Sequence, residues 1–356
     1  MVKADGYGAG AVGVAKALGM SFVEGDASSG RVRLAADKGN RDSLWGVGVA
    51  SLSEAESLRL AGYCGRIFSP VPMLRSEFPR AIELGVRPSL HLSEDIKLWR
   101  ELGAARAPWH LSVDTGMSRA GARWDRVDQL IEALRSAPPE GVFTHFHSAD
   151  EIPGSMDEQD ARFAAALEVL RSVLPDDVLV HSDNSAAIAA RSHGSQGHLA
   201  RPGIALYGGL FTAELKLRQV ISLRARVIDV RDVLPGETVS YGATWTAERV
   251  CRVATLALGY ADGYRRHLSN RAEALLHGQR CRVLGRVTMD MTMLDVTGQT
   301  CAPGDMVTFM GRDGLAEITP EELARRSGVS PYELLTGLGI RLPHFYNEVN
   351  HSLRYT

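Results

Sequence analysis

Short apolar segments and amphipathic helical patterns alternate along the first two-thirds of the chain, and this alternation limits the fold more than any other feature. The apolar segments have the length and composition of β-strands, and helical or loop sequence follows each of them. Strands that alternate with helices form parallel sheets, because each helix returns the chain to the same end of the sheet. We count eight strands, at residues 2–4, 47–50, 66–69, 87–91, 109–114, 142–145, 178–181 and 204–207.

Eight β/α units predict a TIM barrel, with a doubly wound open sheet as the alternative. Residues 25–42 are polar and rich in Gly, Ser and Asp, which predicts a surface loop within the barrel. The helix after the second strand has Ser53 and Glu56 at the spacing of a capping box.

The pattern changes near residue 218, where β-type alternation and turn signals such as Pro235-Gly236 begin. A helical pattern returns only at residues 319–328, with Thr319 and Glu322 as a second capping box. We therefore predict an α/β TIM barrel over residues 1–217, followed by a mainly β domain over residues 218–356.

Composition argues against several classes of function. The net charge of −2 does not favour nucleic acid or anionic membranes as partners. No apolar run approaches the roughly 20 residues of a membrane span, and the first ten residues lack the apolar core of a secretory signal. The four cysteines are scattered without a CxxC motif, so we expect reduced thiols in a cytoplasmic protein.

Reactive side chains occur where the predicted strands end, which is where TIM barrels carry their chemistry. The stretches after the last strands also resemble a phosphate cradle, and a lysine at the end of the first strand could form a Schiff base with a phosphorylated aldehyde. The reactive groups at the predicted strand ends are the side chains of Lys3, Asp114, Arg119, His145, His147, His181, Asn184, Ser185 and Arg201, and the backbone of Gly203.

Other interpretations of these residues stay open at this point. A lone lysine is usually a solvated charge, and glycine-rich stretches are usually turns. His145 and His147 have the i, i+2 spacing of a strand, so they face opposite sides and one is structural. Together with His181 they could instead form the metal site of a barrel hydrolase, which would bind zinc and no aldehyde cofactor.

The motifs together resemble the alanine racemase family, which uses pyridoxal 5'-phosphate (PLP) and combines a barrel with a β domain. The similarity runs nearly end to end and follows the family's order. It rests on VKADGYGAG, VDTGMSRAG, THFHSADE, HSDNSA, RPGIALYG, VSYGATW, LGYADGY and GRVTMDM.

This resemblance implies roles for individual residues. Lys3 would carry the cofactor and act as one catalytic base, and Tyr241 would be the opposite base, donated across a homodimer interface. A cationic neighbourhood of His145 and Arg201 would lower the pKa of Tyr241. The resemblance implies no metal. The implied cofactor-binding residues are Lys3, Tyr7, Arg119, His145, His181, Asn184, Ser185, Arg201, Gly203 and Ile204, with Arg119, Met289 and Asp290 on the substrate and Asp150, Tyr260 and Arg266 at the entrance.

The chain also departs from the family. About three dozen residues normally precede the cofactor lysine, so we expect the first strand to be short here and the lysine to be less firmly held. Ser112 stands where many members have a carbamylated lysine, so Arg119 needs another partner. Ile340 stands where some members have a phosphate-binding tyrosine before an Arg-x-Pro.

The function implied is interconversion of L- and D-alanine by two bases, which would supply D-alanine for peptidoglycan. A racemase that prefers serine is a close variant, since entrance residues set the tolerated side chain. A PLP-binding protein without catalysis is a further alternative, and it would bind the cofactor without exchanging the α-proton.

Overall fold

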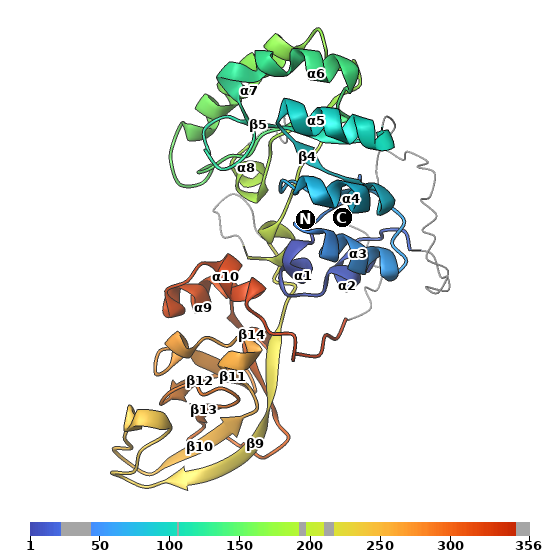
Figure 1. The fold of residues 1–356 in the computed structure, drawn as a ribbon. Helices are drawn as coiled ribbons and strands as arrows, with labels where there is room; N and C mark the ends of the chain where they lie inside the picture. Colours follow the sequence, from blue (N-terminus) through green and yellow to red (C-terminus); the bar gives the residue numbers. More distant parts are fainter. Residues whose placement is uncertain (23–43, 105–106, 192–196, 210–216, 347–356) are drawn as a thin grey trace, which may run out of the picture. The chain divides into compact units, whose positions relative to one another are not determined.

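A computed structural model of the chain describes residues 1–22, 44–104, 107–191, 197–209 and 217–346. They form two compact units (Figure 1). The first unit comprises Met1–Gly6 and Gly10–Gly203, and the second comprises Tyr7–Ala9 and the described residues from Ile204 onward. The surface loop predicted at residues 25–42 lies outside the described residues.

Parallel strands build the first unit, as the alternating pattern predicts. One sheet has the order β1-β2-β3, and the other has the order β4-β5-β7-β8 with β6 beside β5. Six of the eight predicted strands are present. The bounds are β1 (Val47–Gly48), β2 (Ile67–Phe68), β3 (Val86–Arg87), β4 (Ser89–Leu90), β5 (His110–Asp114), β6 (Ala122–Arg123), β7 (Gly141–Phe143) and β8 (Leu179–His181).

Pro88 divides the strand predicted at residues 87–91 into β3 and β4. Proline has no backbone N–H and cannot donate to a neighbouring strand. Its carbonyl still accepts a hydrogen bond from the His110 backbone N–H at 2.9 Å. The chain therefore passes from one parallel sheet to the other at this residue.

The strand predicted at residues 2–4 is wrong. Val2 does donate a backbone hydrogen bond to Gly48 O at 2.8 Å, but helix α1 (Lys3–Tyr7) begins at the next residue. Ala4, Asp5 and Gly6 have φ of 53°, 48° and 61°, so this turn is left-handed. L-residues adopt this conformation at a cost of about 1–2 kcal/mol each. Asp5 holds the turn, because its Oδ1 accepts from Ala11 N at 2.8 Å.

The strand predicted at residues 204–207 is also wrong, since Ile204–Tyr207 forms a 3-10 turn in the second unit. Ile204 O accepts a hydrogen bond from Gly209 N at 3.2 Å. A buried apolar run of four residues fits a strand and a helical turn equally well by sequence.

Helices follow the strands of the first unit, and α5 and α6 contact each other (Figure 1). The N-cap of helix α3 lies two residues before the predicted one. The N-cap is Ser51, whose Oγ accepts from Glu54 N at 3.3 Å, so the prediction of Ser53 and Glu56 is wrong. The bounds are α2 (Ala11–Ala17), α3 (Leu52–Leu60), α4 (Phe78–Glu83), α5 (Ser93–Trp99), α6 (Ile131–Ser136), α7 (Ser155–Leu170) and α8 (Ser185–Ala190).

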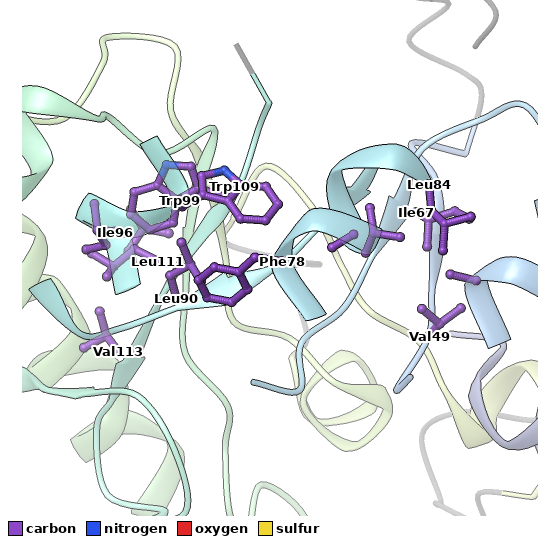
Figure 2. Packing of buried hydrophobic residues seen from close by; sticks show 14 of the residues in the cluster. Val49, Ile67, Phe78, Leu84, Leu90, Ile96, Trp99, Trp109, Leu111 and Val113 are labelled. Carbon is purple, nitrogen blue, oxygen red and sulfur yellow. The ribbon is translucent and has the colours of Figure 1, made fainter. Parts of the chain in front are cut away.

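Apolar side chains from these helices and strands pack into one core (Figure 2). Phe78 of α4 contacts Trp99 of α5 edge to face, with ring centroids 5.4 Å apart. Trp99 also donates its Nε1–H to Ala107 O at 3.1 Å, which satisfies its polar atom inside the core. Leu90 and Leu111 continue the same cluster on β4 and β5.

The second unit is mainly β, as predicted. Its strands pair antiparallel in the order β11-β12-β13-β10-β9-β14-β15, and β11 also pairs with β14, so the sheet closes on itself. The bounds are β9 (Leu223–Val233), β10 (Cys251–Leu256), β11 (Glu273–Leu276), β12 (Gln279–Leu284), β13 (Thr292–Asp295), β14 (Met306–Asp313), β15 (Ala316–Ile318), α9 (Pro320–Ser327) and α10 (Pro331–Thr336).

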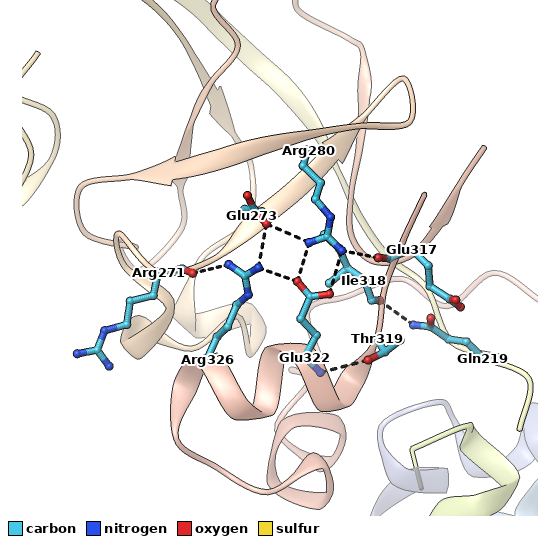
Figure 3. Close-up of polar contacts among 9 residues, drawn as sticks. All are labelled: Gln219, Arg271, Glu273, Arg280, Glu317, Ile318, Thr319, Glu322 and Arg326. Atoms are coloured by element: carbon cyan, nitrogen blue, oxygen red, sulfur yellow. Dashed lines mark hydrogen bonds and ion pairs between the residues drawn. The ribbon is translucent and has the colours of Figure 1, made fainter. Parts of the chain in front are cut away.

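Helix α9 is attached to this sheet by ion pairs (Figure 3). Thr319 Oγ1 accepts from Glu322 N at 3.1 Å, which confirms the predicted N-cap. The Glu322 carboxylate binds Arg280 of β12 at 2.6 Å and Arg326 of its own helix at 2.9 Å. Glu273 of β11 binds both arginines, at 3.0 and 2.8 Å. A shared network of this kind stabilises more than isolated surface pairs do.

Two further predictions concern the whole chain. All four cysteines are free and buried, which confirms the expected thiols. Among the described residues, no helix combines the length and apolar character that a membrane crossing requires.

Candidate functional site

Lys3 lies at the start of the left-handed turn and is half-buried. Burial lowers the pKa of its amine, the charge of Arg119 lowers it further, and Glu54 opposes the shift. A lysine must lose its proton before it can attack a carbonyl, so a lowered pKa raises the fraction of reactive amine.

Glu54 holds this turn and was not among the predicted site residues. Its Oε1 accepts from Ala4 N at 2.7 Å, and its Oε2 accepts from Ala50 N at 2.6 Å. One carboxylate therefore connects the residue after Lys3 to Ala50, in the segment between β1 and α3. The Ser51-x-x-Glu54 spacing was the available signal, and the neighbouring Ser53–Glu56 pair has the same spacing.

Arg201 is buried, and its guanidinium is fixed by three short hydrogen bonds. Nη2 donates to Thr144 O at 2.7 Å and to Ser182 O at 2.9 Å, and Nη1 lies 2.6 Å from His181 Nδ1. Burial lowers the pKa of Arg201 to about 10, against the opposing charge of Asp183. The side chain stays cationic at neutral pH.

His145 faces this arginine, with its Nδ1 3.5 Å from Arg201 Nη2. Burial lowers the pKa of His145 to about 3, and the charges of Arg201, Arg119 and Lys3 add to the shift. His145 is therefore neutral, and the prediction of a cationic His145 is wrong. His147 is exposed, with its Nδ1 2.9 Å from Ser148 Oγ, so the two histidines do face different surroundings.

The two predicted phosphate-binding residues of the first unit, Ser185 at the start of α8 and Gly203, are hydrogen-bonded to each other. Ser185 Oγ accepts a hydrogen bond from Gly203 N at 2.8 Å. Asn184 caps α8, since its Oδ1 accepts from Ala187 N at 2.9 Å, and its Nδ2 donates to Phe146 O at 3.3 Å. The Asn184 side chain thus has a structural partner at each end.

Tyr7 is buried in the second unit and stacks on Tyr207, with ring centroids 4.7 Å apart. Burial raises the pKa of Tyr7 to about 12, and Tyr332 contributes to the shift. The phenol stays protonated and can donate a hydrogen bond. Ile204 is fully buried in its 3-10 turn.

Tyr241 is exposed to 74% in the second unit. Its loop is held by Ser240, whose Oγ donates to Arg286 O at 2.6 Å. Tyr260 and Met289 are exposed as well, and the Tyr260 backbone N–H donates to Thr288 O at 2.9 Å.

Arg341 connects two acidic side chains in the second unit. It binds Asp290 and Asp262, at 2.9 Å in each case. Asp290 therefore has an arginine partner, which sequence analysis did not anticipate. Ile340 beside it is fully exposed, while Arg266 is also an exposed residue.

The remaining predicted residues of the first unit differ in exposure. Arg119 and Asp150 are exposed, and Ser112 is buried on β5. Arg119 follows a turn that Asp114 holds, since Asp114 Oδ1 accepts from Gly116 N and Ser118 N at 2.9 and 3.1 Å.

The metal-site interpretation finds no support in this geometry. Within the described ranges, no group of three His, Cys, Asp or Glu side chains is arranged to hold a metal ion. Both ring nitrogens of His181 have partners, Arg201 on one side and His110 at 2.8 Å on the other. An arginine at this position also repels a cation.

Comparisons with known proteins identify the family. Residues 25–210 match the family described as alanine racemase, N-terminal domain, and residues 220–346 match alanine racemase, C-terminal domain. The alanine racemase of Deinococcus radiodurans is 37% identical over 348 residues, which cover 96% of this chain and 90% of the relative.

Solved structures agree. Alanine racemase from E. faecalis superposes with a TM-score of 0.83 at 31% identity, covering 97% of this chain and 90% of that one. Alanine racemase from Bartonella henselae, described with covalently bound pyridoxal phosphate, gives a TM-score of 0.80 at 26% identity, with coverage of 97% and 91%. The TIM barrel with a C-terminal β domain is thereby confirmed, and the chain belongs to the alanine racemase family of PLP-dependent isomerases.

Proposed function

We propose that this chain interconverts L- and D-alanine with two bases, Lys3 and Tyr241, that act on opposite faces of the substrate. The observation that carries the proposal is the environment of Lys3, where burial and Arg119 lower the pKa of an amine held on a fixed turn. In one direction, Tyr241 Oη takes the Cα proton and Lys3 Nζ returns a proton on the other face; in the reverse direction the roles exchange.

The residues of the first unit fit PLP by the chemistry of their donors. The aldehyde needs an amine with a lowered pKa, which Lys3 supplies. Ser185 and Gly203 would hold the phosphate, and buried Arg201 would face the pyridine nitrogen. When bound, PLP acidifies the Cα–H bond of the amino acid.

The family resemblance adds residues of the second unit to the cofactor site. Tyr7 and Ile204 would contact the phosphate, and the protonated Tyr7 phenol suits an anion. Asn184 would act by shaping the cofactor loop rather than by touching the phosphate, because its half-buried side chain caps α8. His181 would act through Arg201.

The Arg201 charge would matter for the reaction type. An arginine donates hydrogen bonds but does not give up its proton at working pH, so it cannot protonate the ring nitrogen. The ring then withdraws electrons less strongly. Side reactions such as transamination would be disfavoured relative to return of the proton.

We propose further that Tyr241 serves the active site of a second copy of the chain, in a homodimer. Its 74% exposure supports this, because a catalytic phenol needs protein around it to exclude water from the reacting atoms, and this chain leaves the Tyr241 side chain uncovered.

Substrate selection would involve residues of both domains. Arg119 and the Met289 backbone N–H would bind the carboxylate, with Asp290 beside them. Asp150, Tyr260 and Arg266 would line the entrance and limit the side chain to that of alanine, or to serine in a broader enzyme. We also propose that the two domains divide at residues 217/218. The enzyme would make D-alanine in the cytoplasm, and the product would be used in peptidoglycan.

Exchange of the α-proton in deuterated water tests the two-base assignment. We expect Tyr241→Phe, loaded with PLP, to lose racemisation in both directions, because either direction needs both bases. Lys3 should still exchange the α-proton of one enantiomer only, detected by NMR of each enantiomer supplied separately.

Tyr346→Phe, another exposed tyrosine of the second unit, is the matched control and should retain activity. Exchange into both enantiomers by the Tyr241→Phe protein would contradict the assignment. Absence of exchange in the unsubstituted chain, with the cofactor bound, would instead favour a PLP-binding protein without catalysis.

A further inference from the structure

A line of hydrogen bonds crosses the interior of the first unit from Arg201 to Glu140. Arg201 Nη1 lies 2.6 Å from His181 Nδ1, and His181 Nε2 lies 2.8 Å from His110 Nδ1. His110 Nε2 lies 3.3 Å from Glu140 Oε2. The four residues come from the stretch before Gly203, from β8, from β5 and from the residue before β7.

Only one arrangement of protons satisfies every bond in this line. A guanidinium only donates, so His181 Nδ1 must be the unprotonated acceptor. His181 Nε2 then carries the hydrogen and donates to His110 Nδ1. His110 Nε2 in turn carries its hydrogen and donates to the Glu140 carboxylate. Both histidines are neutral, and each donates from Nε2.

The far end of the line is fixed by Arg87 of β3. Its Nε donates to Glu140 Oε2 at 2.6 Å and its Nη2 donates to Oε1 at 3.3 Å. Burial alone would raise the pKa of Glu140, but the hydrogen bonds from His110 and Arg87 outweigh it and lower the pKa to about 2. Glu140 is therefore an anion, which can only accept.

Aromatic rings enclose the two histidines. Phe143 stacks on His181 with centroids 5.1 Å apart, and Phe68 lies 4.7 Å from the His110 ring. His110 and His181 are almost completely buried. Within such an apolar surrounding, a donor without an acceptor is costly, so each bond depends on the next.

We propose that His110 and Glu140 are positioning residues for Arg201. Because Glu140 can only accept, it fixes the hydrogen of His110 on Nε2. His110 Nδ1 then accepts from His181 Nε2–H, which leaves His181 Nδ1 as the acceptor for the Arg201 guanidinium. If His181 carried its proton on Nδ1, that N–H would oppose Arg201 Nη1, and the guanidinium would move. The consequence for catalysis rests on the proposed function, in which Arg201 faces the pyridine nitrogen; the proton arrangement itself does not.

The ring nitrogens of the two histidines test the proposal directly. We expect ¹⁵N NMR of the full chain without cofactor, labelled at histidine and at neutral pH, to show Nε2–H and bare Nδ1 for His110 and His181. Assignment uses His110→Gln and His181→Gln. A charged ring or an Nδ1–H form at His181 in the unsubstituted chain would overturn the proposal; the protonation states are read from the unsubstituted chain, and the two variants serve only to assign its signals.

Substitution of Glu140 tests transmission. Glu140→Leu removes the acceptor for His110, so we expect the His110 nitrogens to shift toward the Nδ1–H form. In the PLP-loaded protein, the absorption band of the cofactor should shift and kcat should fall roughly 10-fold with little change in KM. Glu140→Gln keeps an acceptor oxygen and should restore the nitrogen shifts, the band and kcat to near their original values.

Glu83→Leu is the matched control, because it removes an exposed glutamate that pairs with Arg80 outside this line. Unchanged histidine shifts and an unchanged cofactor band in Glu140→Leu would overturn the positioning role. If the histidines have the expected forms but the chain lacks racemase activity, the line of hydrogen bonds is supported and the proposed function is refuted.

Discussion

Glu54 shows how a single carboxylate can set both the position and the charge of the proposed catalytic lysine. It accepts backbone hydrogen bonds from Ala4 and Ala50, and it is the one group that raises the pKa of Lys3 against burial and Arg119. The hydrogen bonds of Glu54 thus hold Lys3 in place, while its negative charge keeps more of the Lys3 amine protonated. Removing the carboxylate would free more of the amine while loosening the turn that carries it.

This opposition predicts the behaviour of Glu54→Gln. We expect the rate at which Lys3 is trapped by PLP and borohydride to reach its midpoint at lower pH, because the anion that raises the pKa of Lys3 is gone. The plateau rate at high pH should fall, since one amide nitrogen now faces a backbone donor. Glu56→Gln on the same helix, where the side chain pairs with Arg80, should alter neither quantity. A midpoint that stays fixed or rises would contradict this account.

At the scale of elements, the strands that alternate with helices were predictable and the details at their ends were not. β2, β5, β7 and β8 were predicted from short apolar runs. The left-handed turn at Lys3 was not, because Ala4 carries no signal for positive φ and its backbone N–H is held by Glu54, which is distant in sequence. Pro88 was a visible signal for the division of a strand.

The strands β5, β7 and β8 and their ends also bury histidines, which predicts how stability responds to pH. Burial is the main cause that lowers the pKa of His110, His145 and His181. A histidine with a lowered folded-state pKa contributes stability that is complete above its unfolded value of about 6.5 and is lost as pH falls below it.

We therefore expect the free energy of unfolding to decrease below pH 6.5, by roughly 1.4 kcal/mol per pH unit for each such histidine. For His145 the loss should continue until about pH 3, where its folded-state pKa lies. Urea unfolding at pH 7.5, 6.5 and 5.5 measures the slope. His145→Gln should have a shallower slope than the unsubstituted chain, whereas His147→Gln, at an exposed site, should not. Equal slopes for the two variants would refute the assignment.

At the scale of the whole molecule, ordered motifs identified the family, while local contacts determined what each residue does. The predicted Arg201 and His145 do lie together, and Ser185 bonds Gly203. Sequence could not foresee that His145 is neutral, because its pKa depends on its burial in the folded chain and on charges from three other segments. Glu54 was missed for a different reason. Two overlapping Ser-x-x-Glu spacings occur at the start of the same helix, and the sequence does not show which one forms the cap.

The most direct test of the account is to find which lysine carries the cofactor. The chain has only five candidates: Lys3, Lys16, Lys38, Lys97 and Lys216. The purified protein is mixed with PLP, reduced with borohydride, digested and mapped by mass spectrometry, with Lys3→Ala as the control. We expect a pyridoxyl group on Lys3 and its loss in the variant. A modification spread over the other lysines, or one that persists in Lys3→Ala, would contradict it.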